Sequence, residues 1–397
     1  MKQGWEIKKL GEVAHISPSK SEVKTFALNP MDMVSFLPME DLTIGRTFVH
    51  PNKQKTLSEV EGSYTYFKEG DVLLAKVTPC FENGKLAIAK GLYNNIGFGS
   101  SEYIVIRPMQ HIVNSQYLIY LLQTNVFRNG GRTLMIGACG LKRLPKPYVA
   151  NYELPIPSLA EQERIVEILD REFEKIDALK ANAERSLQQA KDLFQSALKQ
   201  ELQPKEGWVT IPMGNVCELK QGLAINAKTK HLLVEKSKLP LLRIKDLKDG
   251  TREIFVNESE CPQGCRAYPE DIIYTRTGTL GLVFTGAYGV MHNNCFKIEI
   301  DKEKIDKHYL MYYLQQDSFR SNIIKLASRA AQPDITHKLF KEQIIHFPAI
   351  AEQVAITRKL SDFREYCQAL EENYKKTIAL CDDMKQALLR QAFNGEL

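Results

Sequence analysis

One long helical pattern occurs twice in this chain of 397 residues, and the repetition limits the architectures that it can adopt. The first copy, residues 154–202, is mostly polar but has an apolar side chain at every third or fourth position, which predicts a helix with a narrow apolar seam. The second copy, residues 345–393, aligns with it without a gap, and Pro157 falls on Pro348, 191 residues later. We therefore expect the segment before each copy to be repeated as well.

The first long helix has recognisable ends. Ser158 suits the N-cap and Glu161, three residues later, completes a capping box, while Pro204 stops the helix. In the second copy Ala349 takes the capping position, which predicts a weaker start, and Gly395 supplies a C-terminal stop.

A helix of about 40 residues is about 60 Å long and cannot bury its seam alone, so we predict that the two helices pair, most simply as an antiparallel coiled coil. The expected interface residues are Ile165, Leu169, Ile176, Leu187 and Phe194 in the first helix and Ile356, Leu360, Leu370, Ile378 and Leu388 in the second. The same seams continue through Phe173, Leu179, Ala183, Ala190 and Ala197, and through Phe363, Cys367, Tyr374, Cys381 and Met384.

Shorter motifs also occur twice, before the helices. Gly4-Trp5 and Gly207-Trp208 each precede a short apolar alternation, which predicts the entry of a module and its first strand. Residues 69–76 and 269–276 each read as a turn followed by an apolar strand that ends in a lysine or an arginine. These pairs indicate two modules of similar construction.

The remaining patterns place each module in the α+β class. Short apolar runs separated by Gly, Pro and Asn predict strands through residues 29–107. Residues 116–128 and 308–320 have helical spacing of Tyr and Leu, and residues 137–146 and 327–338 look like loops that carry cations. We predict an α+β fold in which two β-rich domains are joined by two long helices that form an antiparallel coiled coil, with a pseudo-twofold internal repeat.

Composition narrows the class of protein. The net charge is +5, and since the two long helices are slightly acidic, the globular modules hold the basic excess, which suits contact with phosphates. No apolar run reaches the roughly 18 residues that span a bilayer, and residues 1–13 lack the apolar core of a signal peptide. We expect a cytoplasmic protein that does not enter a membrane. The eight cysteines show no paired zinc spacing, so reduced thiols are expected.

The motifs of several enzyme classes are missing. Residues 277–281, TGTLG, follow a strand but lack the Gly-Lys-Ser/Thr of a phosphate loop, and a tight hairpin or close backbone approach to another molecule are equally good interpretations. No methyltransferase box is present, and Pro333-Asp334 is not followed by the remaining carboxylates of a nuclease site. We expect a binding protein with no catalytic residue and no metal site.

The Gly-Trp box with LGE (residues 10–12), the phrase LPIPSLAEQERIVEILD (154–170), the module strands, and the ending LLRQAFNGEL (388–397) resemble the specificity subunit of type I restriction–modification systems. The resemblance covers essentially the whole chain. It implies target-recognition domains at 1–157 and 204–348, each reading one half of a split, asymmetric sequence in double-stranded DNA. It also implies that the helices, at 158–203 and 349–397, set the spacing between the halves.

The resemblance implies partners too. Two methyltransferase subunits would attach and use S-adenosylmethionine, and restriction subunits bound to that assembly would use ATP and Mg²⁺, so no cofactor is expected on this chain. The acidic outer face of the first long helix is the expected seat of the methyltransferase subunits.

Cations and hydroxyls near the strand ends and loops are the candidates for DNA contact. Arg276 is the strongest, because an arginine at a strand end beside a glycine-rich loop can reach a base edge with two hydrogen bonds. Thr78-Pro79-Cys80 replaces the Thr-Gly-Thr pattern, so Lys76 does not map securely onto the role of Arg276. The candidates are Lys76, Thr78, Lys85, Arg132, Lys142 and Arg143 in the first module and Arg243, Lys245, Arg276, Thr277, Thr279, Lys325 and Arg329 in the second.

Two other classes stay open from the sequence. The chain could be a coiled-coil scaffold whose modules bind protein, or an enzyme with an unrecognised active site. Salt-dependent binding to duplex DNA would favour a DNA-reading protein over a protein-binding scaffold. An enzyme would need a cluster of carboxylate, His or Cys side chains, which the sequence does not show.

Overall fold

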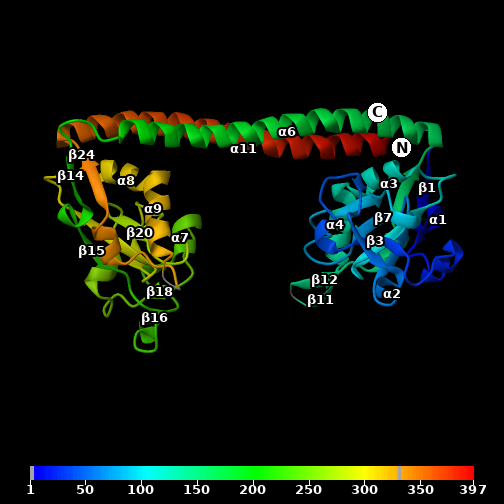
Figure 1. The fold of residues 1–397 in the computed structure, drawn as a ribbon, viewed down its shortest axis with the longest axis horizontal. Coiled ribbons are helices and arrows are strands. Elements are labelled where there is room, and N and C mark those ends of the chain that lie inside the picture. The colour runs from blue at the N-terminus through cyan, green and yellow to red at the C-terminus, as the bar shows by residue number, and fades with distance from the viewer. Residues whose placement is uncertain (1–3, 139, 330–331) are drawn as a thin grey trace. The chain divides into compact units, whose positions relative to one another are not determined.

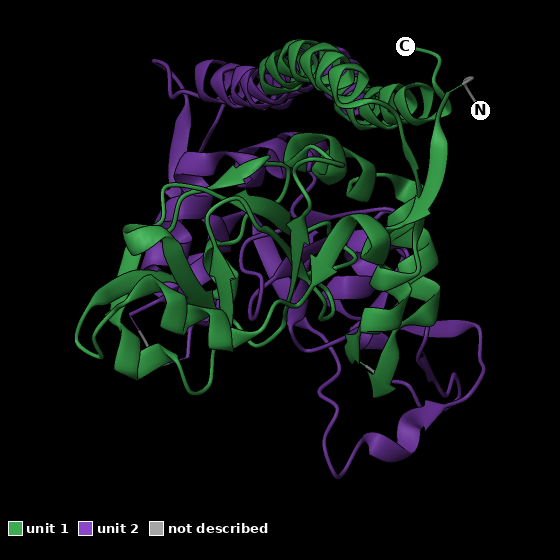
Figure 2. Ribbon diagram, turned by 90° about the vertical axis from the view of Figure 1, so that its right-hand side faces the viewer, with its two compact units in different colours: residues 1–183, 376–397 green, residues 184–375 purple. Residues whose placement is uncertain are grey.

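A computed structural model describes residues 4–138, 140–329 and 332–397 (Figure 1). The chain divides into two compact units, residues 1–183 with 376–397 and residues 184–375 (Figure 2). Each unit contains one globular module together with half of each long helix, so the units cut across the helices rather than following the domain boundaries expected from the sequence. Those boundaries stay a prediction.

Unit 1 is built on two sheets. A five-stranded sheet has the order β2-β10-β7-β8-β4 and a four-stranded sheet the order β5-β3-β9-β6. The strands are β1 (Glu6–Lys9), β2 (Ala14–Ile16), β3 (Met33–Leu37), β4 (Phe48–Val49), β5 (Lys53–Thr56), β6 (Thr65–Lys68), β7 (Val72–Ala75), β8 (Leu86–Ala89), β9 (Ile96–Gly99), β10 (Tyr103–Pro108), β11 (Ile136–Ala138), β12 (Leu141–Arg143) and β13 (Glu153–Ile156). The shorter helices are α1 (Leu10–Val13), α2 (Leu57–Val60), α3 (Ser115–Leu122), α4 (Asn125–Leu134) and α5 (Lys146–Ala150).

Unit 2 repeats this plan. Its sheets have the orders β15-β23-β20-β21 and β16-β18-β17-β22-β19. The strands are β14 (Val209–Pro212), β15 (Cys217–Gln221), β16 (Leu233–Val234), β17 (Leu239–Leu242), β18 (Phe255–Val256), β19 (Arg266–Ala267), β20 (Ile272–Thr275), β21 (Val283–Phe284), β22 (Gly289–Met291), β23 (Cys295–Ile300) and β24 (Ile344–Phe347). The shorter helices are α7 (Ile244–Asp249), α8 (Lys307–Gln315), α9 (Asp317–Ala327) and α10 (His337–Lys341).

The strand expected after each Gly-Trp box is present and closes its module. In unit 1, β1 pairs antiparallel with β13, the strand that leads into the long helix, and in unit 2 β14 pairs with β24 in the same way. The strands expected before residues 76 and 276 are also present, as β7 and β20. In its sheet β7 pairs with β10, and β20 pairs with β23. The α+β interpretation and the internal repeat are confirmed at this level.

The helical segment predicted after the sheets is broken in both units. In unit 1 the helix ends at Leu122 and a second begins at Asn125, because Thr124 takes the N-cap position and its hydroxyl accepts from the N–H of Phe127 at 3.3 Å. In unit 2 the break falls at Gln316, between α8 and α9. A second correction concerns residues 137–146, expected as a loop, which contain most of the β11–β12 ribbon.

The long helices are α6 (Leu159–Glu201, 43 residues) and α11 (Ile350–Asn394, 45 residues). Ser158 precedes α6 and its hydroxyl accepts from the N–H of Glu161 at 3.4 Å, as expected of an N-cap. Within unit 1 the first half of α6 pairs with the last half of α11, and Lys180 binds Asp382 at 2.7 Å. Within unit 2 the last half of α6 pairs with the first half of α11, where Lys359 binds Glu201. The two helices are therefore antiparallel.

The apolar seam between the helices follows the expected positions for most of its length. Ile165, Leu169, Ile176, Phe194, Ile356 and Leu360 are buried, whereas Leu187, Leu370, Ile378 and Leu388 are half-buried. Leu179 and Met384 were expected in the seam, but their exposed fractions of 46% and 47% contradict this. Leu198 and Leu389 are buried although they were outside the expected seam, because the module cores extend onto the helix ends.

Four glutamines attach the modules to the helices. Gln162 near the start of α6 is fully buried; its side chain accepts from the N–H of Asn114 at 2.8 Å and donates to the carbonyls of Ile112 and Pro157, both at 2.9 Å. Gln353 makes the same three bonds in unit 2, to the N–H of Asp306 and the carbonyls of Lys304 and Pro348. The glutamine of each Ala-Glu-Gln phrase therefore fixes the start of a long helix to its module; we call these attachments, together with those of Gln195 and Gln386 below, the glutamine locks.

The other helix of each unit contributes the second pair. Gln386 of α11 accepts from the N–H of Asn125 at 2.8 Å and donates to the carbonyl of Gln123 at 3.2 Å. Gln195 of α6 accepts from the N–H of Asp317 at 3.0 Å and donates to the carbonyl of Gln315 at 3.2 Å. Each module thus contacts the start of one long helix and the end of the other. The second pair also lies 191 residues apart, although the sequence analysis did not single it out.

No helix in the described parts of the chain is long and apolar enough to cross a membrane.

Candidate nucleic-acid interface

Main-chain hydrogen bonds establish which residues of the two modules correspond at the strand ends. The N–H of Lys76 donates to the carbonyl of Glu102 at 2.9 Å, and the carbonyl of Lys76 accepts from the N–H of Leu144 at 2.7 Å. In unit 2 the N–H of Arg276 donates to the carbonyl of Asn294 at 2.8 Å, and its carbonyl accepts from the N–H of Ile335 at 2.9 Å. Lys76 and Arg276 therefore occupy the same backbone position.

Arg276 is held rigidly at this strand end. Its Nε donates to Asp334 at 2.8 Å, its Nη2 donates to the same carboxylate, and its Nη1 donates to Gln221 at 2.9 Å. A guanidinium has five N–H donors, so these bonds leave one donor on Nη1 and one on Nη2. Guanine offers two acceptors, O6 and N7, on its major-groove edge, which matches a pair of donors of this kind. The side chain of Arg276 is 21% exposed.

In the first module a different element supplies the guanidinium. The ammonium of Lys76 donates to the carbonyl of Ser101 at 2.9 Å, and burial lowers its pKa although Glu102 lies nearby. The arginine at this place is Arg143 of β12, whose Nε and Nη2 bind Glu102 at 3.0 and 2.7 Å. Hydrogen bonds from Arg143 lower the pKa of the Glu102 carboxyl, so this ion pair is charged at neutral pH. Each module thus presents an arginine held by a carboxylate, but from different backbone positions: Arg143 corresponds to Asp334, and Glu102 corresponds to Asn294.

The hydroxyl candidates serve the loops around these arginines. Thr78 Oγ1 donates to the carbonyl of Lys142 at 2.9 Å and accepts from the N–H of the same residue at 2.7 Å, so it fixes β12 to the end of β7. Thr279 Oγ1 accepts from the ammonium of Lys248 at 3.3 Å. Thr277 is half-buried beside it. The segment between β20 and β21 that contains Thr277 and Thr279 is a hairpin connection, and Gly278 and Gly281 have φ of +73° and +72° there.

Three candidate cations bind other groups of the protein, and Lys245 does so while its side chain is 57% exposed. The ammonium of Lys85 donates to the carbonyl of Met39 at 3.0 Å. Arg243 binds Asp246 through Nε and Nη2 at 2.7 and 2.8 Å and also reaches Glu253, and Lys245 binds Glu253 at 2.9 Å. Although burial opposes it, hydrogen bonding with Arg243 lowers the pKa of Asp246 to about 2. These side chains hold loops in place, so we give them less weight as DNA contacts than the strand-end arginines.

The other candidates are open to solvent. Arg132 at the end of α4 has a side chain that is 70% exposed and lies 3.8 Å from Glu82. Lys142, Lys325 and Arg329 are also exposed. Cations of this kind suit phosphate contact more than base readout, because phosphate oxygens accept from flexible side chains without fixed geometry.

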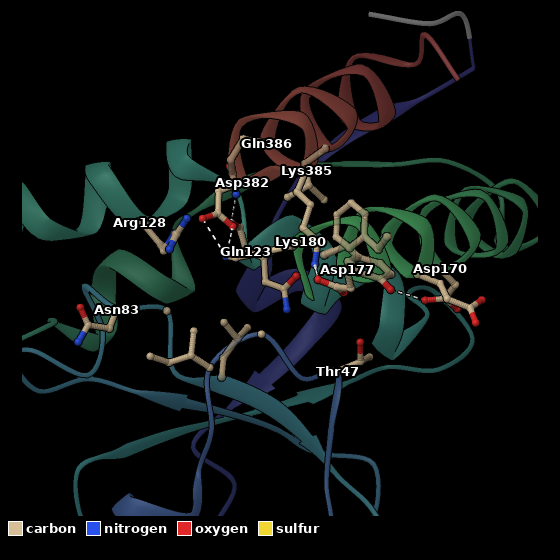
Figure 3. Close-up of a pocket in the computed structure, with 18 residues that line it drawn as sticks. Thr47, Asn83, Gln123, Arg128, Asp170, Asp177, Lys180, Asp382, Lys385 and Gln386 are labelled. Carbon is tan, nitrogen blue, oxygen red and sulfur yellow. Dashed lines mark hydrogen bonds and ion pairs between the residues drawn. The ribbon is translucent and has the colours of Figure 1, made fainter. Parts of the chain in front are cut away.

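A pocket in unit 1 lies between the module and the two helices, and it does not suit a phosphate backbone (Figure 3). Its charged lining alternates in sign: Lys385 binds Asp177 at 2.6 Å, and Lys180 binds Asp382. Tyr120 donates to Asp170 at the same wall. The lining has four carboxylates and three cations, and it includes none of the candidate DNA-contact residues.

Sequence reasoning named Arg276 and Arg143 as candidates but did not identify the groups that hold them. Asp334 lies 58 residues from Arg276 and Glu102 lies 41 residues from Arg143, and no local pattern links such pairs. Pro333-Asp334 had been weighed as part of a nuclease site; the carboxylate instead binds an arginine. Among the described residues no group of three or more His, Cys, Asp or Glu side chains is arranged to hold a metal ion.

Comparison with known proteins identifies the same family in both halves of the chain. A family model described as the type I restriction modification DNA specificity domain matches residues 2–189 and again 205–380. The EcoEI specificity subunit of Escherichia coli is 35% identical over 196 residues, 49% of this chain and 32% of that protein. The EcoKI specificity subunit of Escherichia coli K12 is 23% identical over 357 residues, 81% of this chain and 76% of that protein. The matched part thus spans about a third of the EcoEI relative.

Two solved structures share the fold. A chain from a study of complex assembly and conformational transition of the type I R-M system has a TM-score of 0.83 at 20% identity, covering 100% of this chain and 99% of that one. The HsdS subunit from Thermoanaerobacter tengcongensis has a TM-score of 0.55 at 19% identity and covers 100% of this chain and 98% of that one.

Proposed function

This chain belongs to the family of type I restriction–modification DNA specificity domains, and from that premise we propose that it is a non-catalytic subunit that reads a split DNA sequence for a methyltransferase and nuclease complex. Each module reads one half of the target. The subunit supplies recognition, and the chemistry belongs to partner subunits.

The observation that carries this proposal is the pair of carboxylate-held arginines, Arg143 with Glu102 and Arg276 with Asp334. A fixed guanidinium at a strand end is suited to hydrogen bonding with base edges. Because the two clusters come from different elements and have different neighbours, the two half-sites differ, and the complete target is asymmetric.

We propose that the coiled coil sets the gap between the half-sites. Every module is tied to both helices by buried or half-buried glutamines, so a change of helix length is passed to the modules rather than absorbed by a flexible joint. Two reading modules suit half-sites about one helical turn apart, 34–36 Å, on one side of the duplex.

The proposed partners follow from the family. Two methyltransferase subunits use S-adenosylmethionine and attach along the acidic outer face of the first long helix. Restriction subunits that use ATP and Mg²⁺ join through that assembly. The proposed site of action is the cytoplasm, where the chromosomal DNA lies.

Mapping methylated bases across the genome of a host that expresses this chain with its methyltransferase tests the proposal. We expect one motif made of two different specified halves separated by unspecified bases. A single contiguous motif would exclude two reading modules. Purified chain that shows no salt-dependent binding to duplex DNA would instead favour a scaffold whose modules bind protein.

A further inference from the structure

The β11–β12 ribbon of unit 1 is unusually exposed for a segment with apolar side chains. All described residues of both strands are exposed, and Ile136 and Leu141 are 72% and 52% accessible. Figure 1 shows the two strands projecting from the body of the unit on the side away from α6. Two large apolar side chains this exposed on one short ribbon are candidates for contact with another molecule.

The register places the apolar side chains on one face. Ile136 pairs with Arg143 and Ala138 pairs with Leu141, so these four side chains point to the same side of the ribbon. Gly137 and Lys142 point to the other side. One face is therefore apolar with an arginine at its base.

The ribbon is held firmly even though few side chains cover it. The carbonyl and N–H of Lys142 both bind Thr78, and a further bridge joins Val77 with Arg143. Arg143 in turn binds Glu102. A two-stranded ribbon alone is marginally stable, so these anchors indicate that its position matters.

The charge around the ribbon identifies the class of partner. From Tyr103 to Tyr152 the sequence contains six Lys and Arg residues and no Asp or Glu. Lys142 and Lys146 are exposed, and so is Arg132. Although Glu102 pairs with Arg143 in space, the ribbon joins apolar side chains to the exposed cations Lys142 and Lys146. This combination suits a partner with an anionic backbone and an apolar interior edge, which describes duplex DNA.

Resting on the proposed DNA-reading function, we propose that the β11–β12 ribbon enters the major groove and that Ile136 and Leu141 contact the bases there, chiefly thymine methyl groups. The major groove is about 12 Å wide and admits a two-stranded ribbon, whereas the minor groove is about 6 Å wide. Thymine C5-methyl groups are the apolar feature of the major-groove edge. Lys142 and Lys146 then face phosphates and Arg143 a base edge.

The experiment uses the full chain and a duplex selected from a random-sequence pool by the wild-type protein. Three proteins are compared: wild type, the double variant Ile136→Ser with Leu141→Ser, and the control Val126→Ser. Val126 is an exposed apolar residue of the same unit, 66% accessible, and it lines a groove beside α11. Each protein is titrated with the selected duplex and with the same duplex carrying deoxyuridine for thymidine in the half-site that the first module reads.

We expect the double variant to bind the selected duplex roughly 5- to 150-fold more weakly, with an unchanged salt dependence because its cations remain. Deoxyuridine weakens binding of the wild type and of the control but has no further effect on the double variant. Equal binding by all three proteins overturns the proposal, and so does a deoxyuridine effect that is the same in the double variant. Wild-type protein that selects no duplex contradicts the proposed function itself.

Discussion

At the scale of residues, the two modules reach a similar chemical arrangement by different means. In unit 2 the strand-end residue is the arginine and a later loop supplies the carboxylate. In unit 1 the later strand β12 supplies the arginine and the turn before β10 supplies the carboxylate. A carboxylate that binds Nε and Nη2 fixes the plane of the guanidinium, and a fixed plane discriminates between bases because a misplaced acceptor loses both hydrogen bonds.

Arg276→Ala is expected to weaken binding to the cognate duplex by about 1–3 kcal/mol and to relax selectivity at one base position. Asp334→Asn keeps the arginine but removes its charged partner, so we expect a smaller loss of binding free energy and relaxed selectivity at the same base position. Titration against the selected duplex and single-base variants measures both. Lys325→Ala, which removes an exposed cation of α9, is the control and should weaken all sequences alike. A uniform loss for Arg276→Ala would make Arg276 a phosphate contact.

The sequence placed Arg276 correctly at a strand end, because the apolar pattern of a strand and the cation that follows it lie next to each other in the sequence. It could not identify Asp334, Gln221 or Glu102 as partners, because those contacts join distant segments. The role of Lys76 was left open because Thr78-Pro79-Cys80 departs from the Thr-Gly-Thr pattern of the second module. In the structure the ammonium of Lys76 binds the carbonyl of Ser101, a contact that the sequence pattern does not show.

At the scale of elements, buried glutamines explain why the phrase around the start of each long helix is repeated. A neutral amide can accept from one backbone N–H and donate to two carbonyls without carrying a charge into the core. Gln162 and Gln353 use these three bonds to satisfy main-chain groups that precede α3 and α8 and groups before the helix itself.

Gln353→Ala and Gln162→Ala should each lower the free energy of unfolding by about 1–3 kcal/mol, because an N–H and two carbonyls lose their partner while buried. Chemical denaturation of the full chain measures the change. Gln200→Ala provides the matched control, since this glutamine lies exposed on α6 and should change stability by no more than about 0.5 kcal/mol. Equal effects at buried and exposed positions would show that the amide bonds contribute little.

The elements themselves were largely predictable, since helix and strand periodicities are strong in this chain. The break between α3 and α4 was missed because the Tyr and Leu spacing continues through Thr124, whose hydroxyl caps the next helix. The β11–β12 ribbon was missed because its residues show no buried alternation: both strands are exposed. Leu179 and Met384 were predicted to be buried because the three-and-four spacing of the seam passes through them, but both are exposed in the structure.

At the scale of the whole chain, the helices combine two tasks. They complete the hydrophobic core of each module, where Ile165 and Leu169 pack with Leu389 in unit 1 and Leu198 with Leu360 in unit 2. They also carry the chain from one module to the next. If the helices set the spacing as proposed, a change in them alters that spacing only while the docking positions at their ends are left intact.

Seven residues inserted in both helices, after residue 183 in α6 and after residue 375 in α11, should lengthen the unspecified gap by about three base pairs. Seven residues add about 10 Å and preserve the seam, since they complete one heptad. Methylation mapping measures the gap, and both half-sites should stay unchanged. The insertion in α6 alone is the control, because it puts the facing seams out of register and should abolish methylation. Altered half-sites in the double insertion would contradict a spacing role.

The glutamine locks have a consequence for how new specificities arise. The side chains of Gln162, Gln353, Gln195 and Gln386 bind main-chain atoms of the modules, and none of these bonds depends on a particular module side chain. A module of unrelated sequence can therefore be accepted by recombination if its backbone follows the same path at the two docking points. Selection is then free to vary the reading surface while the attachment stays constant.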